Sequence, residues 1–217
     1  MIEGHFIVIE GIDGAGTTTH STLLAKLLRA KGLPVFLTHQ PSQGPVGAML
    51  RQVLTGRLVV PGVQMNRPPT WSTMALLFAA DRMDHLQAEI IPNLKDGVTV
   101  ICDRYDYSSV AYQSLSAGDV PGAAAWVRDL NRFARRPDLS IVIDVTPEEA
   151  ARRRLSRMVG RELYDEDELQ KDLASFYLNI HEHFPKDTIR HVAGDRSIEE
   201  VRAEILEQVN LLRGETG

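Results

Sequence analysis

The fold of this chain is decided near its N-terminus by residues 6–19, which read FIVIEGIDGAGTTT. The first four residues are apolar without alternation, a pattern typical of a strand that is buried on both faces of a parallel sheet. A glycine-rich turn follows, and a helix with regularly spaced leucines begins near Thr17. Glycines let several backbone N–H groups converge on one anion, and the helix N-terminus adds positive potential. The stretch therefore predicts a phosphate-binding loop.

This loop matches the motif G-x-x-x-x-G-K-S/T at Gly11, Gly16 and Thr18, but Thr17 stands where the motif has lysine. A threonine hydroxyl cannot supply the positive charge that the lysine brings to the outer phosphates of a nucleotide. The Thr18 hydroxyl can still be offered to Mg²⁺. The alternative interpretation is a tight glycine turn that binds nothing. The residues expected to contact the phosphates are Gly11, Asp13, Gly14, Ala15, Gly16, Thr17, Thr18 and Thr19.

The rest of the chain alternates between short apolar runs and helical patterns. Strands are predicted at residues 6–9, 35–37, 98–102, 139–143 and 189–192. Helices are predicted at about 17–31, 72–90, 121–134, 147–157, 165–182 and 198–213. This order predicts a three-layer α/β fold, in which a five-stranded parallel sheet is flanked by helices. We expect one domain over residues 1–217, with a long loop at 54–69 and a short lid insert at about 155–165.

Composition excludes several classes of protein. The formal net charge of −5 gives no global electrostatic reason to bind nucleic acid or an anionic membrane. Cys102 is the only cysteine, which excludes an intrachain disulfide and a zinc site built from several cysteines. The sequence contains neither a membrane-spanning apolar run of about 18 residues nor an N-terminal signal pattern. We therefore expect a cytoplasmic protein.

The predicted helix at 72–90 carries a pair of side chains suited to binding a base. Its core face is predicted to consist of Leu76, Ala80, Met83, Leu86 and Ile90, with Phe78 and Arg82 on the roughly opposite side. An aromatic ring can stack on a base while a guanidinium donates to a base carbonyl. The alternative is that Phe78 packs against another part of the protein and Arg82 forms a surface salt bridge.

Asp103 and Arg104 follow a predicted buried strand. Open α/β sheets bind ligands at the carboxyl ends of their strands, where a carboxylate can organise Mg²⁺ and an arginine can hold a phosphate through two hydrogen bonds. The alternative is an aspartate and an arginine that are simply exposed at the end of a strand.

Several blocks in order resemble the thymidylate kinase family of P-loop nucleoside monophosphate kinases, over nearly the whole chain. They are residues 11–16, 40–47 with Arg51, 77–82, 103–105 with 108–113, and 157–164. The resemblance implies an enzyme that transfers the γ-phosphoryl group of ATP to dTMP with Mg²⁺, giving dTDP and ADP for dTTP synthesis. It also implies a homodimer, with residues 72–90 and 108–134 as candidate interface regions.

The resemblance further implies roles for individual residues. Phe78 would stack on thymine, Arg82 would donate to its O4, and Arg104 would grip the dTMP phosphate beside a metal held by Thr18 and Asp103. Asp13 resembles the residue that meets the 3′-hydroxyl, although it is equally interpreted as a turn-stabilising aspartate. Ser108, Tyr112 and Gln113 would lie along the nucleoside, with Gln113 at the N3 and O2 edge of thymine and Tyr112 at the sugar.

The chain departs from the family in two places. The family's usual Arg-Glu-Pro is His39-Gln40-Pro41 here, so Arg51 becomes the expected acceptor-phosphate contact from this region. To offset the missing loop lysine, we expect Arg157 or Arg161 to act as a catalytic residue that closes over the ATP phosphates. The neighbouring residues Arg152–Arg154 are expected on a solvated helix face, and His20 is expected to be exposed. No histidine is assigned to a metal.

Two other functions remain open from the sequence. One is a P-loop kinase for another acceptor, such as dUMP or a deoxynucleoside. The other is a catalytically impaired protein that binds nucleotides, since both the loop lysine and the carboxylate at position 40 are absent.

Overall fold

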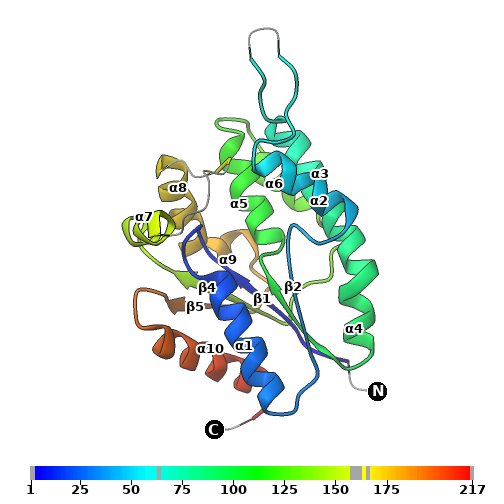
Figure 1. The fold of residues 1–217 in the computed structure, drawn as a ribbon, viewed down its shortest axis with the longest axis vertical. Coiled ribbons are helices and arrows are strands. Elements are labelled where there is room, and N and C mark those ends of the chain that lie inside the picture. Colours follow the sequence, from blue (N-terminus) through cyan, green and yellow to red (C-terminus); the bar gives the residue numbers. More distant parts are fainter. Residues whose placement is uncertain (1–2, 63–64, 157–162, 165–166, 216–217) are drawn as a thin grey trace.

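A computed structural model of the chain describes residues 3–62, 65–156, 163–164 and 167–215, and its centre is a five-stranded sheet (Figure 1). The strand order is β2-β3-β1-β4-β5, and every neighbouring pair is parallel. The predicted parallel α/β sheet is therefore confirmed. The strands are β1 Phe6–Glu10, β2 Val35–His39, β3 Thr99–Asp103, β4 Leu139–Asp144 and β5 Ile189–Ala193.

Helices cover both faces of this sheet, which makes the predicted three layers. Helices α1 (Thr17–Ala30) and α10 (Ile198–Leu212) lie side by side on one face, where α1 contacts β1 to β3 and α10 contacts β4 and β5 (Figure 1). The other face is covered by α4 (Ile91–Lys95) against β3 and by α8 (Asp167–Leu178) against β4. The remaining elements are α2 Pro45–Leu54, α3 Trp71–His85, the π-helical turn Leu86–Ile90, α5 Asp106–Ser116, α6 Ala123–Leu130, α7 Pro147–Ser156 and α9 Ile180–His183.

Helices α2 and α5 are absent from the sequence prediction. Pro45 and Gly47 give α2 the composition of a loop, although proline at the first helical position is compatible with a helix. Helix α5 is rich in serine and tyrosine, which have modest helix propensity. Its N-terminus is instead stabilised by contacts from β1, described below, which no local pattern shows.

The predicted core face of the 72–90 helix is partly wrong. Leu76 is 52% exposed and Ala80 is also exposed, whereas Ala75, Ala79 and Arg82 are buried. The observed buried stripe has regular helical spacing, but it contains an arginine. The sequence prediction placed Arg82 away from the core, and it therefore assigned the core face to the wrong side of the helix. The helix also continues beyond 90 as α4.

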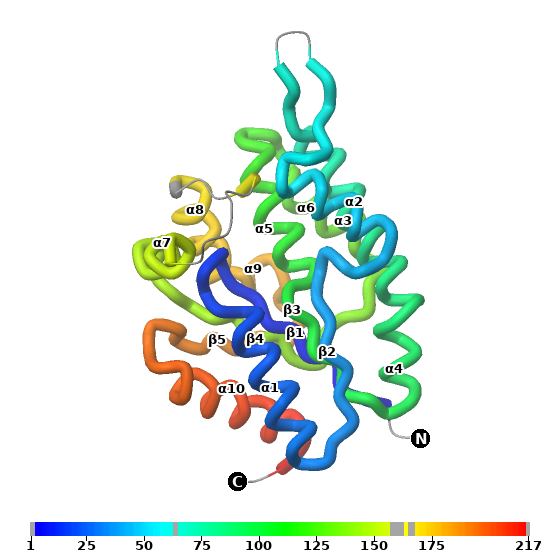
Figure 2. Tube along the Cα trace, viewed as in Figure 1, coloured from blue at the N-terminus to red at the C-terminus, as the bar shows by residue number. Residues whose placement is uncertain are grey.

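The predicted loop at 54–69 is confirmed by residues 55–62 and 65–70, which extend away from α2 and α3 (Figure 2). An isolated antiparallel bridge joins Val60 and Arg67. The predicted helix at 165–182 is interrupted at Asn179, between α8 and α9. None of the helices in the described ranges combines the length and apolarity needed to cross a bilayer.

The strand ends meet at one edge of the sheet and define the site. Asp103 at the end of β3 is in register with Ile9 of β1 and with His39 of β2. The backbone N–H of Gln40 donates to the Asp103 carbonyl (3.0 Å), and that of Arg104 donates to the Ile9 carbonyl (2.9 Å). The segments after β1, β2 and β3 therefore converge, as expected for an open parallel sheet.

Candidate active site

The glycine loop between β1 and α1 forms the phosphate end of the site. Gly14 has φ of +98°, and a Cβ at this position would lie 2.4 Å from the Ala150 carbonyl oxygen, so only glycine fits. Helix α1 begins after Gly16 without any side-chain cap. The N–H groups of its first turn are therefore open to an anion, as the sequence predicts.

Thr18 and Asp103 meet beside this loop. The Thr18 hydroxyl donates to Asp103 Oδ2 at 2.5 Å, while Asp103 Oδ1 is buried and has no hydrogen-bond partner among the described residues. A hydroxyl and a free carboxylate oxygen are ligands that Mg²⁺ prefers, so these residues fit the predicted metal. Within the described ranges, no group of three or more His, Cys, Asp or Glu side chains is arranged to hold a metal. Nucleotide phosphates and water would complete the coordination.

Arg104 is held firmly at the same end of the site. Its φ is +67°, an uncommon value for a residue other than glycine. Nη2 pairs with Asp13 Oδ1 at 2.5 Å, while Nη1 donates to the Gly11 carbonyl at 2.9 Å and to Ser108 Oγ at 3.1 Å. The side chain is 19% exposed. Arg104 is therefore a positioned cation, in contrast to the alternative of a solvated arginine at a strand end.

Glu10 organises this region and was missed by the sequence reasoning. Its buried carboxylate accepts hydrogen bonds from Tyr105 N (2.7 Å), Ser108 Oγ (2.6 Å) and Tyr177 Oη (2.9 Å), and it also accepts from Ser108 N (3.3 Å). Burial raises the pKa of Glu10, and the nearby Arg104 charge opposes that rise. Glu10 therefore caps the N-terminus of α5 from a different element and holds Ser108 in place.

A cavity of about 530 Å³ runs from the phosphate loop toward α3 and α5. This volume is within the range of small-ligand sites. Its wall brings together half of the predicted site residues, namely Asp13, Thr18, Phe78, Arg82, Asp103, Arg104, Ser108, Tyr112 and Gln113. Arg51 is not part of this wall. Its guanidinium donates to the carbonyl oxygens of Pro41 and Ser42, and its role at the acceptor phosphate stays a prediction.

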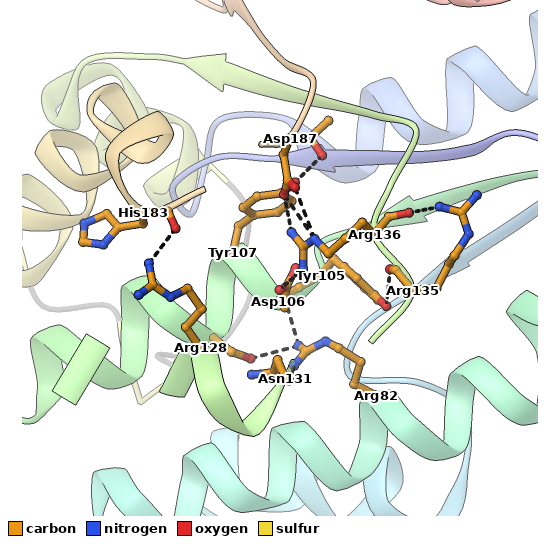
Figure 3. A network of polar contacts seen from close by, with 12 residues as sticks. Arg82, Tyr105, Asp106, Tyr107, Arg128, Asn131, Arg135, Arg136, His183 and Asp187 are labelled. Atoms are coloured by element: carbon orange, nitrogen blue, oxygen red, sulfur yellow. Dashed lines mark hydrogen bonds and ion pairs between the residues drawn. The ribbon is translucent and has the colours of Figure 1, made fainter. Parts of the chain in front are cut away.

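Arg82 lies at the far end of the cavity and is 1% exposed, so the prediction that it faces away from the core is wrong. Nε donates to Gln40 Oε1 (3.0 Å), and Nη2 donates to the Tyr105 carbonyl (3.1 Å) and to Ser109 Oγ (2.9 Å). Nη1 donates to Asn131 Oδ1 (2.5 Å), as Figure 3 shows. A guanidinium has five N–H groups, so one N–H of Nη1 remains without an acceptor among the described residues.

Gln113 lies one helical turn after Ser109 and lines the same end of the cavity. Its Nε2 donates to Tyr164 Oη (3.3 Å), and its Oε1 is buried without a partner in the described part of the chain. Tyr164 packs edge-to-face on Tyr112, with ring centres 5.3 Å apart. Among the described residues, Arg82 therefore keeps one N–H donor and Gln113 one oxygen acceptor without a partner.

Gln40 connects Arg82 to a buried histidine. Gln40 Nε2 lies 3.2 Å from His85 Nδ1, and His85 Nε2 lies 2.8 Å from Thr38 Oγ1 and 3.1 Å from Glu89 Oε2. Burial lowers the pKa of His85, although Glu89 and Asp81 oppose this shift. A neutral His85 ring can accept from Gln40, which leaves Gln40 Oε1 directed at Arg82.

Phe78 has contacts of two kinds, and its stacking on a base stays a prediction. It lines the cavity, and it also packs against a small apolar cluster formed by Leu50, Val53 and Met74.

Two further expectations about the phosphate end are wrong. Arg153 and Arg154 do not lie on a solvated face, because Arg153 Nη2 donates to the Gly194 carbonyl (2.8 Å) and Arg154 Nη1 donates to the Asp13 carbonyl (2.7 Å). Only Arg152 of the three is mostly exposed.

His20 is buried, not exposed, and burial together with the Arg153 charge lowers its pKa. Both errors arise because α7 packs beside the loop. Arg157 and Arg161 lie outside the described residues.

A second polar network supports α5 from behind the Arg82 end (Figure 3). Arg136 bridges the carboxylates of Asp106 and Asp187, and Tyr107 Oη donates to Asp187 Oδ2 at 2.6 Å. Asp106 and Tyr107 are the first residues of α5. The network therefore fixes the helix that carries Ser108, Ser109 and Gln113.

Comparison with known proteins finds the same family in a family model and in individual relatives. A family model described as thymidylate kinase matches residues 9–205. A probable thymidylate kinase of Pyrococcus horikoshii is 39% identical over 94% of this chain and 95% of its own length. One from Thermococcus gammatolerans is 42% identical over 94% of each chain. A thymidylate kinase of Ruegeria pomeroyi is 36% identical over 95% of this chain and 94% of its own.

Proposed function

The chain belongs to the thymidylate kinase family, and from this membership we propose that it transfers the γ-phosphoryl group of ATP to dTMP, giving dTDP and ADP. The observation that carries the choice of acceptor is that Arg82 and Gln113 line one cavity and that, among the described residues, each has an unpartnered group, an N–H on Arg82 and Oε1 on Gln113. Thymine has a carbonyl oxygen at C4 and an N–H at N3, which match this pair. Cytosine has an amino group and an unprotonated nitrogen at these positions, so both contacts would be mismatched.

The opposite end of the cavity suits a phosphate. Arg104 keeps its charge partly exposed to the cavity while Asp13 fixes its direction. The phosphate of dTMP is already an anionic nucleophile, so no strong general base is required. The enzyme must mainly align the two phosphates and stabilise charge on the transferred group. Arg104 is suited to hold the acceptor phosphate, and Asp13 to keep Arg104 in the correct orientation.

The donor phosphates would bind at the glycine loop, where the first-turn N–H groups of α1 are open. Thr18 and Asp103 would hold Mg²⁺, which supplies positive charge next to the donor phosphates when it is bound. Arg153 and Arg154, anchored on the loop backbone, add positive charge close to the position where Thr17 replaces lysine. A contribution from Arg157 or Arg161 stays a prediction.

The test is a coupled ADP-release assay with ATP and Mg²⁺ and a panel of acceptors: dTMP, dUMP, dCMP and thymidine. We expect dTMP to have the highest kcat/KM. A preference for thymidine or dUMP would replace the proposed acceptor. Binding of dTMP and ATP without dTDP in a single-turnover experiment would instead indicate a nucleotide-binding protein that has lost the chemistry.

We also propose that the chain forms a homodimer through α3 and α6. Leu76 on α3 is 52% exposed and Trp126 on α6 is 37% exposed, which is consistent with apolar contacts to a second copy. Light scattering should give twice the monomer mass, and Leu76→Glu should shift the protein toward monomer. A monomeric wild-type protein would contradict the proposal. A cytoplasmic location likewise stays a prediction.

A further inference from the structure

Gln170 is a fully buried amide that joins two parts of the site. It lies near the start of α8 and is 0% exposed. Its Oε1 accepts from the Asp13 backbone N–H at 3.3 Å, while Nε2 donates to Asp13 Oδ2 at 3.1 Å and to the Tyr164 carbonyl at 2.9 Å. The backbone N–H can only donate, and the carboxylate and carbonyl oxygens can only accept, so these partners determine the orientation of the amide.

The contacts of Gln170 complete the restraint of Asp13. Asp13 N and Oδ2 are held by Gln170, its carbonyl oxygen accepts from Arg154, and Oδ1 pairs with Arg104. Every polar atom of Asp13 therefore has a partner. Among the described residues, only Gln170 contacts both the backbone and the carboxylate of Asp13, so it fixes the plane of the carboxylate relative to the loop.

From these contacts we propose that Gln170 is a positioning residue for Arg104, acting through Asp13, and that it thereby determines how tightly the acceptor phosphate is held. This inference rests on the proposed function, in which Arg104 holds the phosphate of dTMP. Gln170 is not among the residues that line the cavity. Its loss would let the Asp13 carboxylate rotate and would make the direction of the Arg104 guanidinium less defined, although the contacts of Arg104 to Gly11 and Ser108 remain.

The first experiment measures dissociation constants of dTMP and thymidine, which differ only in the phosphate. The variants are Gln170→Met, which keeps the length of the side chain without its hydrogen bonds, and Gln87→Met as a control on an exposed surface. We expect Gln170→Met to reduce the preference for dTMP over thymidine about tenfold, with thymidine affinity nearly unchanged. In the Arg104→Ala background, Gln170→Met should have no further effect on that preference. A merely structural role would weaken both ligands together, and equal weakening would overturn the proposal.

The second experiment uses Gln170→Glu and the pH dependence of kcat/KM for dTMP, and it holds even where Gln170→Met folds poorly. An ionised carboxylate at this position would face two acceptors, Asp13 Oδ2 and the Tyr164 carbonyl. A protonated one can accept from Asp13 N and can donate one of the two hydrogen bonds that the amide donates. Burial beside Asp13 raises the pKa of the introduced carboxyl group. The ratio of variant to wild-type activity should therefore rise at least tenfold as the pH falls from 8 to 6.

A ratio that is independent of pH would overturn the proposal. Measuring dTDP formation by the wild-type enzyme distinguishes failure of this inference from failure of the proposed function. If wild type makes no dTDP from dTMP, the proposed function and this inference both fail. If wild type is active and the variants keep its phosphate preference and pH profile, only the role of Gln170 is refuted.

Discussion

The two ends of the cavity each contain an arginine, but the two arginines differ in burial and in how their charge is balanced. At the phosphate end, Arg104 pairs with the Asp13 carboxylate at 2.5 Å and keeps part of its surface open. At the base end, Arg82 is fully buried, and all of its acceptors in the described part of the chain are neutral: Gln40, Asn131, Ser109 and a backbone carbonyl. No ion pair with Arg82 is present among the described residues.

This difference matches the two kinds of ligand group that the ends are proposed to bind. A phosphate is bound by a cation whose position is fixed but whose charge is still accessible. A single carboxylate fixes the direction of such a guanidinium without enclosing it. A neutral base needs one well-aimed donor, and neutral amides align the guanidinium without a competing negative charge. Burying a cation without a counter-ion is costly, and the neutral acceptors and the Tyr105 ring, 5.1 Å from Arg82 Cζ, offset that cost.

The phosphate end should give the largest effect. Arg104→Ala removes the cation proposed to hold the acceptor phosphate, and we expect kcat/KM for dTMP to fall roughly a thousandfold. The coupled ADP-release assay measures this, with Arg132→Ala as a control because Arg132 is 61% exposed. A fall of less than about tenfold would mean that another group holds the phosphate, and the contrast between the two ends would be lost.

The base end should control selectivity. Gln113→Leu removes the acceptor proposed for thymine N3–H, so we expect the ratio of kcat/KM for dTMP to that for dCMP to fall roughly thirtyfold. Gln87→Leu, on an exposed surface, should leave the ratio unchanged. An unchanged ratio in Gln113→Leu would show that this end does not discriminate between bases by hydrogen bonding.

A substitution of Thr17 tests whether the phosphate end lacks positive charge where the ATP phosphates are proposed to bind. Thr17→Lys restores the ammonium group of the motif, and we expect KM for ATP to fall about tenfold while KM for dTMP is nearly unchanged. Thr17→Ser serves as the control, since it adds no charge. If KM for ATP does not fall, the threonine is not a deficit in this protein.

The smallest effect concerns His85, which supports the base end through Gln40. Burial holds the pKa of His85 below 6.5, so the unfolded chain binds this proton more readily than the folded one. The stability that comes from neutral His85 is therefore complete above pH 6.5 and is lost as the pH falls through the lower folded value. We expect the free energy of unfolding to decrease toward acid by at most about 1.4 kcal/mol per pH unit.

Urea denaturation of wild type and His85→Asn between pH 5 and 8 isolates this contribution. His20 also has a lowered pKa and gives both proteins part of the same slope, so the difference between them reports His85. We expect a flatter dependence in His85→Asn. Identical slopes would show that protonation of His85 does not weaken the base end.

Much of the fold was predictable because it depends on local patterns. The continuous apolar run at Phe6–Ile9 predicts a strand buried on both faces, and the glycines after it predict the loop. The polar helix α5 was not predictable, since its cap is Glu10, which lies 95 residues before Tyr105 in the sequence. A cap that distant leaves no local signal.

The site residues show the same limit. Asp103, Arg104 and Gln113 could be named from their order along the chain, and the structure brings them to one cavity. Glu10, Asn131 and Gln170 could not be named. Each of them contacts a site residue far from it in the sequence and is not among the residues that line the cavity, so only the three-dimensional contacts identify them.

By itself, the sequence determined the parallel sheet and the glycine loop, because these follow from residue type, order and periodicity, and its resemblance to the family implied which groups would meet phosphate and base. Only the tertiary structure decided the environment of those groups. Among the described residues, it buries Arg82 with neutral acceptors, leaves Gln113 Oε1 without a partner and gives every polar atom of Asp13 a partner. Burial and hydrogen-bond partnership depend on which distant segments pack together, and no local pattern records that.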